Sequence, residues 1–93
     1  MTRDLDTPIT ALDGTPAVEG DRPLTVGLVS ANALLLSGDG DGPAKAERYR
    51  LAVRLAGKGE VDLTPEDLAA IKAAVGAQYL PLIVGQVFAW ADA

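Results

Sequence analysis

The segment that most constrains the fold is the last one, from Tyr79 to Ala91, because it is apolar on nearly every side. Gln86 is the only strongly polar residue inside it. A helix with apolar residues all round has to bury most of its surface. In a chain of 93 residues the other elements have little surface with which to cover it. Two interpretations stay open: this segment is the central element of the core, or part of it contacts another chain.

The second interpretation predicts an interface made of the large and polar side chains of this segment. Aromatic residues, tryptophan above all, are enriched at the centres of protein interfaces, although near the end of a small domain they are also typical of a core. The predicted interface residues are Tyr79, Leu82, Ile83, Gln86, Val87, Phe88 and Trp90.

The rest of the chain predicts an α+β fold, in which a short N-terminal β-hairpin packs on three to four helices. Asp13-Gly14, between two short stretches with β-branched residues, indicates the hairpin turn. The helices are expected from Thr25, as N-cap, to Leu36, then over 43–56, from 65 to about Val75, and in the final segment. Gly27 counts against the first helix, since glycine costs ~1 kcal/mol relative to alanine there.

Apolar spacing predicts which side of each of the first three helices faces the core. The clearest local signal is Thr64-Pro65-Glu66-Asp67, in which Thr64 caps the N–H of Asp67 and the acidic residues meet the positive end of the helix dipole. The expected core residues are Val26, Val29, Ala33 and Leu36, then Tyr49, Ala52, Val53 and Ala56 flanked by Leu51 and Leu55, and then Leu68, Ile71 and Val75.

We expect residues 1–93 to form a single domain, with residues 1–7 as a disordered tail and residues 37–42 as a flexible loop. The first residues carry neither a basic nor an apolar targeting segment, and no apolar run approaches the ~20 residues that span a bilayer. The chain has no cysteine, so a disulfide framework is excluded. The expected location is the cytoplasm, with no membrane contact.

The chain offers few groups for chemistry. It has neither histidine nor cysteine, which removes the commonest general base and the commonest metal ligands. Residues 39–42 are similar to a fragment of a calcium loop, but the twelfth position counted from Asp39 is Arg50 instead of glutamate. Glu66 and Asp67 beside Asp62 could be interpreted as paired catalytic carboxylates, but helix capping and dipole compensation account for Glu66 and Asp67. We therefore predict no catalytic residue, no cofactor, no metal site and no small-molecule substrate.

A net charge of −5 disfavours nucleic acid and anionic membranes as partners, because their phosphates have to be neutralised by basic residues. One basic cluster, Lys45, Arg48, Arg50 and Arg54, is interrupted by Glu47. It is either the solvated face of a helix or a phosphate-binding patch. The second interpretation gives an alternative function: a small transcriptional or nucleic-acid-associated regulator that uses the basic face of the 43–56 helix.

Several segments resemble a pattern found among small proteins encoded by bacteriophages and prophages, mostly of unassigned function. These segments are residues 48–52, 61–72, 75–76 with 79–86, and also 13–14 and 33–35. The resemblance implies a phage accessory, assembly or virion-associated protein in the cytoplasm of a bacterial host, with no catalytic residues to transfer.

Together these observations predict a non-enzymatic protein whose function is to contact another protein. The apolar C-terminal helix is the expected contact surface. It would bind a protein partner or a second copy of the chain.

Overall fold

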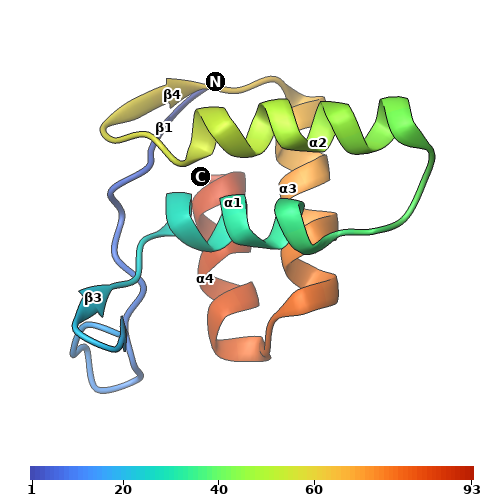
Figure 1. The fold of residues 1–93 in the computed structure, drawn as a ribbon. Helices are drawn as coiled ribbons and strands as arrows, with labels where there is room; N and C mark the ends of the chain where they lie inside the picture. Colours follow the sequence, from blue (N-terminus) through green and yellow to red (C-terminus); the bar gives the residue numbers. More distant parts are fainter.

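The computed structural model describes all 93 residues and contains four helices and two small antiparallel sheets (Figure 1). The predicted α+β fold is confirmed. In chain order the elements are β1 (Thr2–Asp4), β2 (Val18–Glu19), β3 (Arg22–Pro23), α1 (Val26–Leu36), α2 (Gly42–Leu55), β4 (Glu60–Asp62), α3 (Pro65–Gln78) and α4 (Pro81–Asp92).

The central element of the core is α1, and not the C-terminal segment. Thr25 caps α1 as predicted, because its hydroxyl accepts a hydrogen bond from the N–H of Leu28. α1 contacts each of the other three helices (Figure 1). Most sides of α1 are buried in the core. Its buried residues are Val26, Gly27, Val29, Ser30, Ala31, Ala33 and Leu34.

Gly27 lets the first turn of α1 approach two backbone segments closely. Its N–H donates to the carbonyl of Leu5 over 3.1 Å. A Cβ atom at this position would lie 2.8 Å from the carbonyl oxygen of Leu55 and 3.0 Å from that of Leu5. The residue that counted against a helix in the sequence is therefore required by the packing around it.

The N-terminal turns differ from the predicted hairpin in their strands. The Asp13-Gly14 turn is present, with Gly14 at a φ of 87°, but only an isolated bridge between Thr10 and Pro16 flanks it. The N–H of Ala11 donates to Thr15 and that of Ala17 to Ile9, but the N–H of Ile9 donates to Leu24 and not back to Ala17, so the pairing goes no further. The paired strands are β2 and β3, joined at Gly20-Asp21.

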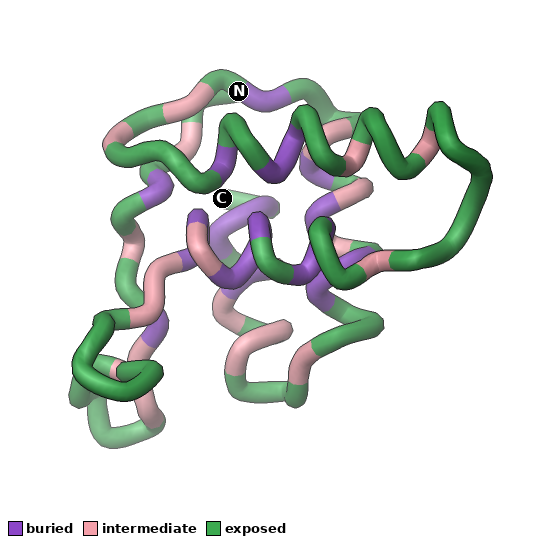
Figure 2. Tube along the Cα trace, viewed as in Figure 1, coloured by how far each residue is buried: buried purple, intermediate pink, exposed green.

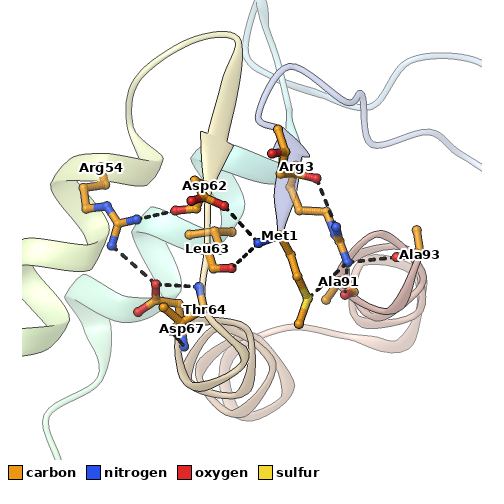
Figure 3. Close-up of polar contacts among 10 residues, drawn as sticks. Met1, Arg3, Arg54, Asp62, Leu63, Thr64, Asp67, Ala91 and Ala93 are labelled. Atoms are coloured by element: carbon orange, nitrogen blue, oxygen red, sulfur yellow. Dashed lines mark hydrogen bonds and ion pairs between the residues drawn. The ribbon is translucent and has the colours of Figure 1, made fainter.

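The expectation of a disordered tail over residues 1–7 is not met. β1 pairs antiparallel with β4, with Arg3 opposite Val61, and Leu5 is only 2% exposed. The guanidinium group of Arg3 donates to the carbonyl oxygen of Trp90 over 3.0 Å. It also donates to the carbonyl oxygens of Ala91 over 3.0 Å and of Ala93 over 2.8 Å (Figure 3). A local pattern cannot reveal this order, since the partners lie far along the chain.

The core-facing stripe of α2 is rotated relative to the predicted one. Its buried residues are Leu51, Ala52 and Leu55, whereas Tyr49 is 60% and Val53 56% exposed. Figure 2 shows most of α2 as exposed, with its buried residues on the side toward α1. The buried row continues toward the N-terminus through half-buried Arg48, whose aliphatic stem covers apolar surface. Leu36, predicted to be buried in α1, is 67% exposed.

The capping box of α3 is confirmed. The Thr64 hydroxyl accepts from the N–H of Asp67 over 3.1 Å, and the Asp67 carboxylate accepts from the N–H of Thr64 over 3.0 Å. The helix buries Leu68, Ile71 and Val75 as predicted, but it continues through Gly76 to Gln78, because Gly76 does not adopt a positive φ.

The loop between α1 and α2 ends at Asp41, which is the N-cap of α2. Its carboxylate accepts from the N–H of Ala44 over 2.9 Å, so α2 begins at Gly42 and the loop is one residue shorter than predicted. None of the four helices combines the length and the apolarity needed to cross a bilayer.

Candidate interface

The predicted interface residues of the C-terminal segment divide into three groups. Val87 and Trp90 are 0% and 8% exposed, so they belong to the core of the chain and are not available to a partner. This corrects the predicted set, and the reason is that α4 packs one side against α1 and α3. Tyr79, Ile83, Gln86 and Phe88 are half-buried, and Leu82 is exposed.

Gln86 joins α4 to the N-terminal region. Its amide oxygen accepts from the N–H of Thr10 over 2.9 Å, and its amide nitrogen donates to the carbonyl of Thr10 over 2.7 Å. The side chain thus pairs with the backbone of Thr10 as a neighbouring strand would. The one polar residue of the apolar segment therefore positions the loop that follows Thr10.

The two half-buried aromatic residues also contact their own chain. The Lys72 ammonium lies 5.1 Å from the centre of the Phe88 ring, a cation–π distance, and it pairs with Asp92 over 2.8 Å. Burial raises the pKa of the Tyr79 phenol, the charge of Glu19 raises it further, and a hydrogen bond with Asn32 acts in the opposite direction. Phe88 therefore joins α4 to α3, and Tyr79 interacts with residues of β2 and α1.

The exposed apolar surface lies at the start of α4. A groove of about 420 Å³ is lined by Thr10, Ala11, Leu12, Pro81, Leu82, Gly85 and Gln86; we call it the α4 groove. Leu12 is 97% exposed and Leu82 42% exposed, and Leu80, which precedes the groove, is 78% exposed. Leu12 is not among the residues predicted from the sequence to form the interface. The signal that could have found it is a leucine directly before an Asp-Gly turn.

The residues that line the α4 groove carry no charge. The acidic residue nearest to it in the sequence is Asp13, which directly follows Leu12. Other acidic residues have partners elsewhere in the chain: the Asp6 carboxylate accepts from the N–H of Gly59, and Asp92, at the far end of α4, pairs with Lys72.

Asp13 fixes the loop that presents Leu12. Its carboxylate accepts from the hydroxyl of Thr15 over 2.7 Å and from the N–H of Thr15 over 3.0 Å. These two bonds lower the pKa of Asp13, with the hydroxyl bond as the largest cause.

We predict that the carboxyl group of Asp13 titrates below the ordinary aspartate value of about 3.9. A lowered pKa means that the loop bonds are fully formed above that value and are lost as the pH falls through the pKa of the folded state. The titration can be followed by NMR at the amide of Thr15. Thr15→Val removes the hydroxyl bond and should move the midpoint back toward 3.9, whereas Thr2→Val should leave it unchanged; equal midpoints in both variants would contradict the assignment.

The basic cluster of α2 contacts the chain's own acidic and carbonyl groups. Arg50 forms an ion pair with Glu47, and Arg48 donates to the carbonyl of Asp39. Arg54 donates to the carbonyl of Asp62 over 2.5 Å and lies 3.4 Å from the Asp67 carboxylate (Figure 3).

Opposite charges therefore mix in the groove of about 340 Å³ between α2 and α3. It is lined by Glu47, Arg48, Arg50, Leu51, Arg54, Glu66, Asp67 and Ala70. A phosphate-binding patch needs an excess of positive charge, and this groove alternates acidic and basic side chains. Lys45 is the only member of the basic cluster whose side chain forms no hydrogen bond or ion pair within the chain.

The remaining carboxylates of interest have structural partners. Asp41 is the N-cap of α2, and Asp67 belongs to the capping box of α3. No three acidic side chains are gathered so that they could hold a metal ion.

Comparisons with protein families, with curated protein sequences and with solved structures found no match to this chain. They therefore have no bearing on the resemblance to small phage proteins.

Proposed function

We propose that this protein acts by binding another protein through the α4 groove, and not by catalysis. The observation that carries the proposal is the exposure of Leu12 and Leu82 on two walls of one groove. Apolar residues that gather on a surface, instead of being scattered singly, are typical of interaction sites.

Hydrogen bonds within the chain hold both walls of the groove in place before any partner binds. The pairing of Gln86 with Thr10 holds one wall against the other, and the bonds from Thr15 to Asp13 fix the loop that carries Leu12. A surface that is already ordered loses less conformational entropy when a partner binds. Burying one exposed leucine side chain contributes about 1.5–3 kcal/mol.

The proposal includes an accessory or assembly role in a phage and a place in the bacterial cytoplasm. The support for these two points is the resemblance of residues 48–52, 61–72, 75–76 and 79–86, with 13–14 and 33–35, to small phage proteins. The groove itself supports only the contact with a protein.

Photo-crosslinking tests the proposal. A photoreactive residue replaces Leu82 in the α4 groove, or Leu36 at the exposed end of α1 as a matched control, in the cells that naturally make the protein. We expect position 82 to give a discrete crosslinked species, which mass spectrometry identifies as a protein, and position 36 to give none. Equal crosslinking at both positions, or none at position 82, would overturn the proposal.

A further inference from the structure

The chain contains three Asp-Gly pairs: Asp13-Gly14, Asp39-Gly40 and Asp41-Gly42. An Asp-Gly pair isomerises without an enzyme when its atoms are free to move, because glycine has no side chain to keep its nitrogen away from the neighbouring carboxyl group. The three pairs have the same local chemistry, so the sequence does not rank them. The structure does, because the hydrogen bonds at the reacting groups differ from pair to pair.

The isomerisation has two steps and needs only water. The glycine nitrogen attacks Cγ of the protonated aspartate carboxyl group, so that a C–N bond forms, a C–O bond breaks, and the hydroxyl group leaves as water with the proton of the nitrogen. Water then adds to one carbonyl carbon of the resulting succinimide ring and breaks its bond to nitrogen. Cleavage at the former main-chain carbonyl gives isoaspartate, in which the chain runs through the side-chain carboxyl carbon.

Asp13-Gly14 is held at both reacting groups. The Asp13 carboxylate accepts from the hydroxyl and from the N–H of Thr15, and the N–H of Gly14 donates to the carbonyl of Ala11 over 3.0 Å. The bonds from Thr15, the hydroxyl bond above all, also lower the pKa of Asp13. A lowered pKa reduces the protonated form that reacts.

Asp41-Gly42 is held by the start of α2. The Asp41 carboxylate accepts from the N–H of Ala44 over 2.9 Å, and its main-chain carbonyl accepts from the N–H of Lys45 over 3.0 Å. Gly42 is the first residue of the helix. Attack within this pair would therefore require the cap to break and the first turn to unwind.

Asp39-Gly40 has neither kind of protection. Both residues are exposed, in the connection between α1 and α2 (Figure 2). The Asp39 carboxylate forms no hydrogen bond or ion pair within the chain, and the N–H of Gly40 donates no hydrogen bond. The carboxyl group is therefore free to turn toward the nitrogen, as the attack requires.

The one polar contact at this pair leaves the reacting atoms free. The guanidinium group of Arg48 donates to the main-chain carbonyl of Asp39, and a Cβ at Gly40 would lie 3.8 Å from both terminal nitrogens of Arg48. This carbonyl and the Gly40 nitrogen belong to one peptide group, which the hydrogen bond polarises. The cation draws electron density from the nitrogen and favours loss of its proton, so Arg48 adds to the reactivity of the pair.

We propose that Asp39-Gly40 is a modification site, at which the folded protein converts aspartate to isoaspartate while the other two Asp-Gly pairs are preserved. The product adds a methylene group to the main chain between α1 and α2 and carries a free α-carboxylate. Carboxyl methyltransferases specific for isoaspartate recognise this group, so the altered chain belongs to their substrate class. Asp39 does not line the α4 groove, so the inference is independent of the proposed function.

Ageing of the purified protein near neutral pH tests the assignment, with one sample folded and a second in urea. Isoaspartate is counted by enzymatic carboxyl methylation and located by electron-transfer fragmentation. In urea we expect the three pairs to react at similar rates. In the folded protein Asp39 should react about tenfold or more faster than Asp13 and Asp41, because each of those carboxylates must first break a hydrogen bond to a charged group.

A matched pair of variants sharpens the comparison. Asp39→Glu keeps the charge but would have to close a larger, less favourable ring, so it should lose most of the methylation of the folded protein. Asp13→Glu, which removes another Asp-Gly pair, should keep it. Isoaspartate spread evenly over the three pairs of the folded protein, or formed first at Asp13 or Asp41, would refute the proposal. An Asp39 that stays unchanged in the folded protein after the urea sample has isomerised would refute it as well.

Discussion

Gly27→Ala is expected to lower the free energy of unfolding by about 2 kcal/mol, because overpacking a core costs about 1–3 kcal/mol and a clash with two backbone carbonyls belongs at the upper end of that range. The added Cβ would meet two backbone carbonyl oxygens at 2.8 and 3.0 Å, and a carbonyl held in the backbone cannot rotate away as a side chain can. The gain in helix propensity, about 1 kcal/mol, offsets only part of this cost. Urea denaturation followed by circular dichroism measures the change.

Gly85→Ala is the matched control, since Gly85 also lies inside a helix but a Cβ there would have nothing within 4 Å. We expect this variant to raise the free energy of unfolding by about 0.5–1 kcal/mol through helix propensity alone. The two alanine variants should therefore shift the denaturation midpoint in opposite directions. A Gly27→Ala protein as stable as Gly85→Ala would show that the close approach of Leu5 and Leu55 to α1 is absent.

Arg3→Met is expected to lower the free energy of unfolding by about 2–3 kcal/mol, in line with the loss of hydrogen bonds made by a charged group. Methionine keeps an unbranched apolar stem but removes the guanidinium group that donates to the last carbonyls of α4. Positive charge at this end also stabilises a helix through its dipole. Denaturation can be followed by the fluorescence of Trp90, the single tryptophan of the chain.

Trp90 reports on the same contact in the folded state. Its indole N–H donates to the carbonyl of Asp4 over 2.9 Å, so loosening β1 should expose the ring and shift its emission to longer wavelength. Arg22→Met is the control, because Arg22 is exposed and exposed substitutions usually change stability by less than about 0.5 kcal/mol. Equal effects of the two substitutions would contradict the role of Arg3.

The parts of the fold that follow from local chemistry could be predicted. Thr25 and Thr64 begin helices because their hydroxyls accept backbone N–H groups within the same turn, and such capping depends on neighbours in the sequence alone. The α+β class follows from the same local signals. Gly27 illustrates the limit: its low helix propensity is local, but the carbonyls that require glycine belong to distant segments.

The candidate site was predicted less completely than the fold. Apolar composition singled out the segment of α4, but it could not tell which side of the helix faces α1, so Val87 and Trp90 were included in the predicted interface although they are buried. Gln86 has a role that depends on Thr10, 76 positions earlier. Leu12 stands directly before the predicted Asp13-Gly14 turn, and its 97% exposure could not be read from that turn alone.

The hydrogen bonds between Arg3 of β1 and the end of α4 limit when the fold can be completed during synthesis. Arg3 is synthesised before its acceptors on α4, which come 87 and 88 residues later. At about 5–20 residues per second, β1 waits several seconds for them. Such distant closures slow folding, and this one can form only after Ala91 has left the exit tunnel.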